Sequence, residues 1–393
     1  MKFLLLPFMW LFVLITRFRN FLYDKNILKT TYFDFPIINV GNLTVGGTGK
    51  TPHVEFLVRF FLENNQDIDK NINQNISQKY QINVLSRGYG RKTKGFLLAN
   101  SETSATEIGD EPRQYFEKFG DKINVVVCEN RVLGATLIQD FNQNLDQNLH
   151  QNYQKNKRNL IILDDAFQHR AIGRNVNILL TDYKRLFYND FPFPVGRLRE
   201  QRKNAQRADF IIVSKCNSDI SKEKMNEIEA QIHAYTGTEK PAFFTKITYG
   251  NPVNLITNLE EVFNENQNLN LILLSGIAQP QLFEDFCKEN LSQKNTLKKH
   301  FIFPDHHQYT QKNINEIVSF IENLERNNTQ NNTQNSNKNI KILTTEKDAV
   351  KLRKLLPEKL KNLFYFLPIT VDFIDKKEEF LQMLLIKTNK LKS

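Results

Sequence analysis

The chain has 393 residues, with 53 Lys and Arg against 43 Asp and Glu, and three cysteines. This length predicts two or three domains with an ample hydrophobic core, and the net charge of +10 favours an anionic partner. The cysteines, at positions 128, 216 and 287, show no Cys-x-x-Cys spacing. That argues against a disulfide framework or a structural zinc site, and it fits a reducing cytosol.

The N-terminal residues 3–16 are almost wholly apolar, with Lys2 before them and Arg17 and Arg19 after them. A helix of this length reaches about 21 Å, whereas the hydrocarbon core of a bilayer is about 30 Å thick. The single tryptophan, Trp10, and the flanking cations favour a helix that lies in the membrane interface over residues 1–25. A buried core helix is the alternative.

Residues 41–52 form a glycine-rich segment between the apolar run 37–40 and a helix-like stretch that begins near Lys50. Glycines let backbone N–H groups surround phosphate oxygens, Lys50 can reach the outer phosphates, and the Thr51 hydroxyl can bind Mg²⁺. Thr44 stands where the usual pattern has its first glycine; the alternative is a turn that merely tolerates glycine. The predicted nucleotide-binding residues are Thr44, Val45, Gly46, Gly47, Thr48, Gly49, Lys50 and Thr51.

Short β-rich runs alternate with helical stretches along two parts of the chain. The first series predicts strands at 37–40, 82–85, 123–127, 160–163, 176–180 and 210–213. Alternation of this kind predicts an α/β, P-loop NTPase-type, doubly wound sheet over residues 26–238. The second series, from 242–248 to the helical stretch 376–385, predicts a second, smaller α/β domain over residues 239–393. Three Asn/Gln-rich tracts, 64–78, 142–157 and 327–337, are interpreted as surface loops.

Three acidic segments carry candidate chemistry. Asp164 and Asp165 follow the buried run 159–163, where a carboxylate can hold Mg²⁺ or its water opposite a P-loop lysine. Asp110 opens a predicted helix, where helix capping and catalysis explain it equally well. Asp305 and His306 follow a strand of the second domain, and they form either an acid/base pair or a polar turn.

Together these motifs resemble the tetraacyldisaccharide 4'-kinases of lipid A biosynthesis over essentially the whole chain. The shared segments are the apolar N-terminus and residues 41–42, 46–52, 86–91, 109–112, 164–169, 196–200 and 305–307. The resemblance implies transfer of the ATP γ-phosphate to the 4'-hydroxyl of a membrane-embedded, acylated glucosamine disaccharide 1-phosphate. ATP and Mg²⁺ are the implied cofactors, and the implied metal-binding residues are Thr51, Asp164 and Asp165.

The same resemblance implies roles for the remaining site residues. Asp110 would accept the proton of the sugar hydroxyl, assisted across the two domains by His306, which Asp305 would orient. The other implied catalytic residues are Lys50, Arg199 and Glu200. Gln168 and His169 would lie near the substrate, and Arg87 and Arg91 are either phosphate or headgroup contacts or merely solvated. Ala166, where the family commonly has glycine, is expected to avoid positive φ.

These features predict a lipid substrate and a membrane surface as partners, and no nucleic acid. They also predict a peripheral or monotopic enzyme on the cytoplasmic face of the inner membrane. The main alternative is a P-loop switch or partitioning ATPase, although such loops usually carry a lysine where this chain has Val45. A nucleotide-dependent assembly factor without turnover of a small molecule is a third hypothesis.

Overall fold

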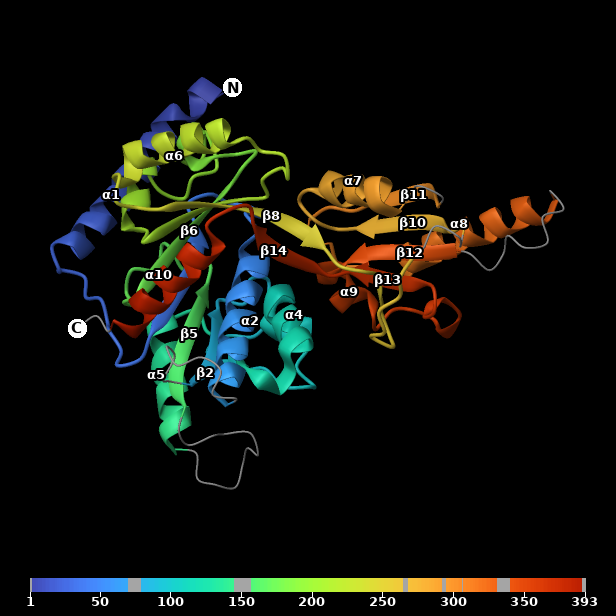
Figure 1. Cartoon of the computed structure of the whole chain (residues 1–393), viewed down its shortest axis with the longest axis horizontal. Helices are drawn as coiled ribbons and strands as arrows, with labels where there is room; N and C mark the ends of the chain where they lie inside the picture. Colours follow the sequence, from blue (N-terminus) through green and yellow to red (C-terminus); the bar gives the residue numbers. More distant parts are fainter. Residues whose placement is uncertain are drawn as a thin grey trace. The chain divides into compact units, whose positions relative to one another are not determined.

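The computed structural model describes residues 2–69, 79–144, 157–263, 268–291, 295–305, 307–330 and 340–390. The chain forms two compact units. Unit 1 comprises Met1–Thr248 together with Thr370–Ser393, and unit 2 comprises Tyr249–Ile369. Both units alternate strands with helices, as the sequence predicts (Figure 1).

In the described residues, unit 1 is built on a nine-stranded sheet in the order β14-β8-β7-β6-β1-β5-β2-β4-β3. The central neighbours, from β8 to β4, pair in parallel, and β3 pairs antiparallel with β4. Parallel pairing brings the carboxyl ends of these strands to one edge of the sheet, where ligands bind in open α/β folds. The strands are β1 Ile37–Asn42, β2 Tyr80–Ser86, β3 Leu97–Leu98, β4 Asn124–Val127, β5 Arg158–Asp164, β6 Val176–Asp182, β7 Phe210–Ser214, β8 Ala242–Tyr249 and β14 Ile369–Phe373.

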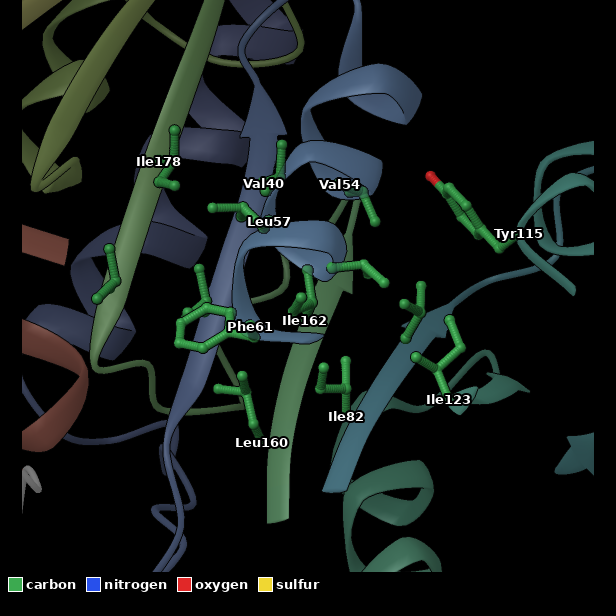
Figure 2. Packing of buried hydrophobic residues seen from close by; sticks show 14 of the residues in the cluster. Val40, Val54, Leu57, Phe61, Ile82, Tyr115, Ile123, Leu160, Ile162 and Ile178 are labelled. Carbon is green, nitrogen blue, oxygen red and sulfur yellow. The ribbon is translucent and has the colours of Figure 1, made fainter. Parts of the chain in front are cut away.

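The helices of unit 1 cover this sheet and bury its apolar side chains. Figure 2 shows Val54, Leu57 and Phe61 of α2 lying over residues of the central strands, with Tyr115 of α4 beside them. All four side chains are essentially excluded from solvent, so α2 and α4 are fixed on the sheet that carries the site. The helices are α1 Leu6–Asp24, α2 Lys50–Asp69, α3 Ala105–Ile108, α4 Asp110–Phe119, α5 Arg131–Asn144, α6 Lys222–Thr236 and α10 Lys377–Asn389.

Unit 2 contains a five-stranded sheet in the order β11-β10-β12-β13-β9. Its strands pair in parallel except β9, which is antiparallel to β13. The strands are β9 Val253–Asn254, β10 Asn270–Ser275, β11 Thr296–Ile302, β12 Ile340–Thr345 and β13 Phe364–Leu367, and the helices are α7 Pro280–Leu291, α8 Gln311–Gln330 and α9 Glu346–Leu352.

The structure corrects the predicted domain limits of 26–238 and 239–393. Strand β8 continues the first sheet, and the C-terminal β14 and α10 return to unit 1. Phe373 and Phe380 join the same buried cluster as Phe210 and Phe243, so burial of aromatic area holds the C-terminus there. Periodicity indicates a strand and a helix in this segment, but it does not indicate which sheet they join.

The Asn/Gln-rich tracts are also partly corrected. Helix α2 extends to Asp69, and the buried Asn65 side chain donates to the Tyr80 carbonyl and accepts from the Tyr80 amide, at 2.8 and 2.9 Å. Helices α5 and α8 likewise run into the second and third tracts. Residues 70–78, 145–156 and 331–339 lie outside the described residues.

Helix α1 packs one face on unit 1 and exposes the other. Met9, Val13 and Asn20 are buried, and the Phe12 ring lies edge-on to that of Phe193 at 5.9 Å. A buried core helix is therefore excluded, because six large apolar side chains of α1 are more than half exposed: Phe8, Trp10, Leu11, Leu14, Ile15 and Phe18. Across the described part of the chain, no helix has the length and apolar character needed to traverse a bilayer.

Candidate active site

The phosphate loop follows β1 and ends at the first turn of α2. Gly46 and Gly49 have positive φ values of 115° and 79°, which only glycine adopts at little cost. Asn42, at the end of β1, donates from its side-chain amide to the Thr48 hydroxyl at 2.7 Å. The loop also pairs with the segment after β6, since the Val45 amide donates to the Arg197 carbonyl at 2.8 Å. The predicted phosphate loop is therefore a defined turn with an external brace.

Three consecutive carbonyls of this loop are held by side chains behind it. Lys215 donates to the Gly47 carbonyl, and the Ser214 hydroxyl donates to the Thr48 carbonyl at 2.8 Å. His53 Nδ1 donates to the Gly49 carbonyl at 2.7 Å, and its Nε2 accepts from the Thr245 hydroxyl at 3.1 Å. Because a carbonyl only accepts, Nδ1 must carry the proton of this buried imidazole. Fixing the carbonyls restricts which way the adjoining N–H groups can turn.

Asp164 ends β5 at the same edge as the phosphate loop. One carboxylate oxygen, Oδ2, accepts from the Tyr115 hydroxyl at 3.1 Å, whereas the buried Oδ1 has no partner among the described residues. Burial raises the pKa of Asp164 to about 7, an effect that Lys50 opposes and Asp165 reinforces. An orphaned buried carboxylate oxygen next to a P-loop lysine suits a hydrated Mg²⁺ ion, which would supply the missing positive charge.

Asp165 occupies a different environment one residue later. Its backbone takes a positive φ of 53°, and its two carboxylate oxygens accept from the Arg199 guanidinium at 2.8 and 3.0 Å. Lys50 Nζ lies 3.7 Å from Oδ2. Burial opposes ionisation, but Lys50 and then Arg199 outweigh it and hold the pKa of this carboxyl below its ordinary value. Ala166, as expected, is not among the residues with positive φ.

Helix α4 begins at Asp110, which is buried, and it is tied to the site by two sets of contacts. The Tyr115 hydroxyl donates to Asp164; burial raises the pKa of Tyr115, and a hydrogen bond with the Thr51 side chain opposes this shift. On another side, the fully buried Glu55 of α2 accepts from the Gln114 amide at 2.9 Å. The helix that carries the predicted base is thereby fixed relative to the phosphate loop and the carboxylates.

The remaining predicted residues of unit 1 divide into two groups. Gln168 lies at the site: its amide donates to the Asn42 carbonyl at 2.8 Å, and its oxygen accepts from Arg199 at 3.4 Å. Burial, reinforced by the neighbouring charges of Arg131 and Arg174, lowers the pKa of His169 to about 4.

The other group is held in ion pairs. Arg91 is buried in a pair with Glu129 at 2.5 Å, and Glu200 is buried between Arg19 and Arg207 at 2.7 and 2.5 Å. These contacts give Arg91 and Glu200 structural partners, which the sequence did not indicate.

In unit 2, Asp305 follows β11 and accepts from Lys347 of α9 at 3.0 Å. The neighbouring His307 stacks on Phe303 with ring centroids 4.6 Å apart. His306 lies outside the described residues. The orientation of His306 by Asp305, and the pairing of His306 with Asp110, therefore stay predictions.

Several residues of the site were missed from the sequence. Arg131, just after β4, is buried, and burial lowers its pKa to about 10 against the opposing charges of Asp164 and Asp165. The position of Arg131 shortly after a predicted strand could have indicated that it lies at the site. Glu111 is near enough to Asp164 to raise the pKa of that carboxyl. For Tyr115 and Lys215 no sequence pattern was available, because each acts through a contact with a distant segment.

A parallel sheet with a phosphate loop after β1, and with two carboxylates at the end of β5, defines a P-loop enzyme that acts on a nucleoside triphosphate. The comparisons with known proteins narrow this class. The family model described as Tetraacyldisaccharide-1-P 4'-kinase matches residues 1–389, so the chain belongs to that family. The chain is therefore a kinase, and the kinase interpretation is favoured over a P-loop switch or partitioning ATPase.

Individual relatives agree over nearly their full length. The tetraacyldisaccharide 4'-kinase of Flavobacterium psychrophilum is 40% identical over 376 residues, covering 96% of this chain and 94% of its own. That of Parabacteroides distasonis is 39% identical, with coverage of 98% and 94%. The crystal structure of LpxK from Aquifex aeolicus in complex with ATP matches with a TM-score of 0.68, 28% identity and 99% coverage of both chains. The predicted family and fold class are thereby confirmed.

Proposed function

We propose that this chain transfers the γ-phosphate of ATP to the 4'-hydroxyl of a tetraacylated glucosamine disaccharide 1-phosphate at a membrane surface. The observation that carries the proposal is the orphaned Asp164 oxygen beside Lys50 in a chain of this family. Phosphoryl transfer depends mainly on positioning and charge neutralisation, and such a site offers both.

Each residue of unit 1 has a distinct part in the proposed transfer. Lys50 and the loop amides bind the phosphates, and Arg199 adds positive charge beside Asp165. Thr51 and Asp164 would hold Mg²⁺, which neutralises charge on the phosphate oxygens when it is bound. Asp110 accepts the proton of the sugar hydroxyl, with His306 assisting.

The proposed place of the enzyme is the cytoplasmic face of the inner membrane, where α1 lies in the interface. The exposed apolar face of α1 supports this contact, as does the basic composition of the chain. Replacing Leu11 and Leu14 together with Asp should lower binding to anionic vesicles at least about tenfold, because both side chains are exposed and lose apolar burial in lipid. The melting temperature of this double variant should stay equal to that of the unmodified protein.

The decisive experiment follows labelled γ-phosphate from ATP into the lipid fraction. The expected product carries the label on the 4' position of the disaccharide, in amounts that require both ATP and the lipid. ATP hydrolysis without a labelled lipid would instead favour a switch ATPase, and nucleotide binding without either would favour an assembly factor.

A further inference from the structure

The inner face of α1 carries Arg19, whose contacts have not been given a role. One guanidinium nitrogen of Arg19 donates to Glu200 Oε1 at 2.7 Å and to the Gln168 carbonyl at 3.3 Å. Arg17, two residues earlier on the same helix, is exposed. Helix α1, which exposes an apolar face, therefore also directs the Arg19 guanidinium toward Glu200.

Glu200 is a costly residue to bury, and its partners explain why it is tolerated. The side chain has no exposed surface, and Oε2 accepts from Arg207 at 2.5 Å and from the Asn204 amide at 3.0 Å. Arg19 satisfies the other oxygen, Oε1. A buried carboxylate whose oxygens are all hydrogen-bonded is held in one position. A shift of one of its partners therefore also moves the carboxylate and its neighbours.

From Glu200 the contacts lead directly to the reaction centre. The adjacent Arg199 holds both oxygens of Asp165 and touches Gln168, whose carbonyl Arg19 also contacts. Asp165 in turn lies 3.7 Å from Lys50 of the phosphate loop. Polar contacts within unit 1, linked through the backbone of Gln168 and the peptide bond between Arg199 and Glu200, thus connect α1 to the phosphate loop.

We propose that Arg19 is a positioning residue that couples the seating of α1 in a lipid surface to the order of the Arg199–Asp165 pair. The proposal rests on the membrane contact proposed above. In water, the outer face of α1 has no anchor, whereas in a lipid interface its exposed apolar side chains are held. Membrane binding then stabilises the docked position of Arg19 and, through Glu200 and Arg199, the nucleotide site.

Thermodynamic linkage gives a direct test, because two coupled sites must change each other's affinity by the same factor. The dissociation constant of a non-hydrolysable ATP analogue with Mg²⁺ is measured with and without phosphatidylethanolamine/phosphatidylglycerol vesicles. For the unmodified protein, vesicles should tighten binding of the analogue about fivefold. In Arg19→Ala that ratio should fall to near one, while vesicle binding stays close to that of the unmodified protein.

Arg17→Ala is the matched control, since it removes the same charge from the exposed side of the same helix. It should lower vesicle binding slightly and keep the fivefold ratio. Arg19→Lys covers the case in which Arg19→Ala melts early, because a lysine keeps the positive charge that Glu200 needs but carries it on a shorter side chain without the planar guanidinium. Its ratio should lie between the other two.

The outcomes separate this proposal from the proposed function. If the unmodified protein binds no vesicles, the membrane contact is wrong and the coupling falls with it. If vesicles bind but Arg19→Ala keeps the full ratio, or if the unmodified protein shows a ratio of one, only the coupling is overturned. Phosphate transfer to the lipid in detergent micelles stays a separate measure of the kinase reaction.

Discussion

Two clusters of ionisable side chains in this molecule have the residue types of an active site, and they differ in how completely they are satisfied. In unit 2, Ser275, His300 and Glu284 form a chain with both hydrogen bonds at 2.8 Å. Ser275 is fully buried, and Glu284 has a second partner in Lys288. At the edge of unit 1, by contrast, the buried Asp164 Oδ1 has no partner within the part of the chain that the structure describes.

The difference shows why geometry alone does not identify a catalytic site. A serine, a histidine and an acid that are linked by hydrogen bonds have the arrangement of a hydrolase triad. A serine without exposed surface, however, cannot reach a substrate. A buried polar atom with no partner is costly, and a protein keeps it where a ligand completes it. The unpaired carboxylate oxygen beside the phosphate loop therefore favours a ligand site at the unit 1 edge, whereas the unit 2 cluster is a structural connection between β10, β11 and α7.

The largest expected effect is from Lys50→Ala, which removes the lysine of the phosphate loop. We expect kcat for lipid phosphorylation to fall about 10³-fold, because charge on the phosphate loses its main compensation. The melting temperature should change little, since Lys50 lies at the start of a helix and is partly exposed. Turnover unchanged at saturating ATP would remove the phosphate loop from the mechanism.

The second largest effect is expected from substitutions at Asp110 and His306, which are proposed to act as one unit. Asp110→Ala and His306→Ala should each lower kcat about 10²-fold or more with little effect on the KM for ATP. The double variant should cost much less than the product of the two single losses, because the second change removes a partner already disabled. Fully multiplicative losses would contradict the pairing.

The placement of the phosphate loop between a strand and a helix, and of Asp164 at a strand end, could be predicted from the sequence because both are local features. What it could not predict depends on contacts between distant segments. The Tyr115 bond to Asp164 and the return of α10 to unit 1 are two examples. The separate environments of Asp164 and Asp165 are a third, since adjacent residues there differ in backbone φ and in partners.

His53 should make stability depend on pH in a defined window. Burial, opposed by the Gly49 carbonyl and reinforced by Lys215, lowers its pKa from 6.5 to about 4 in the folded state. The unfolded chain therefore binds a proton first as the pH falls. The contribution of His53 to the free energy of unfolding should drop by about 3 kcal/mol between pH 6.5 and pH 4, and this contribution should be fully present above pH 6.5.

Chemical denaturation across that range measures the effect. His53→Gln should flatten this part of the pH profile, whereas the same change at the partly exposed His233 should leave its slope as it is. An unchanged slope in His53→Gln would show that another group is responsible.

Tyr115→Phe should have a smaller effect, because it removes only the hydroxyl that donates to Asp164. We expect the Mg²⁺ concentration for half-maximal activity to rise about tenfold, as when a group that orients a metal ligand is lost. Tyr80→Phe is the matched control, because this hydroxyl is also partly buried but donates to Asn389 at 2.8 Å. Tyr80 is the first residue of β2, at the end of that strand that lies away from the site. An equal Mg²⁺ effect in both variants would show a general loss of rigidity.

The smallest kinetic effect is expected in the unit 2 cluster, and it tests the comparison from the other side. Ser275→Ala removes a hydrogen bond to the nearly buried His300, so the free energy of unfolding should fall by about 1 kcal/mol. Because the serine is enclosed, kcat and both KM values should stay within about twofold of the unmodified protein. A loss of phosphate transfer larger than the loss of stability explains would mean that satisfied hydrogen bonds do not mark a structural cluster here. Steady-state kinetics and denaturation on the same preparation decide between the two.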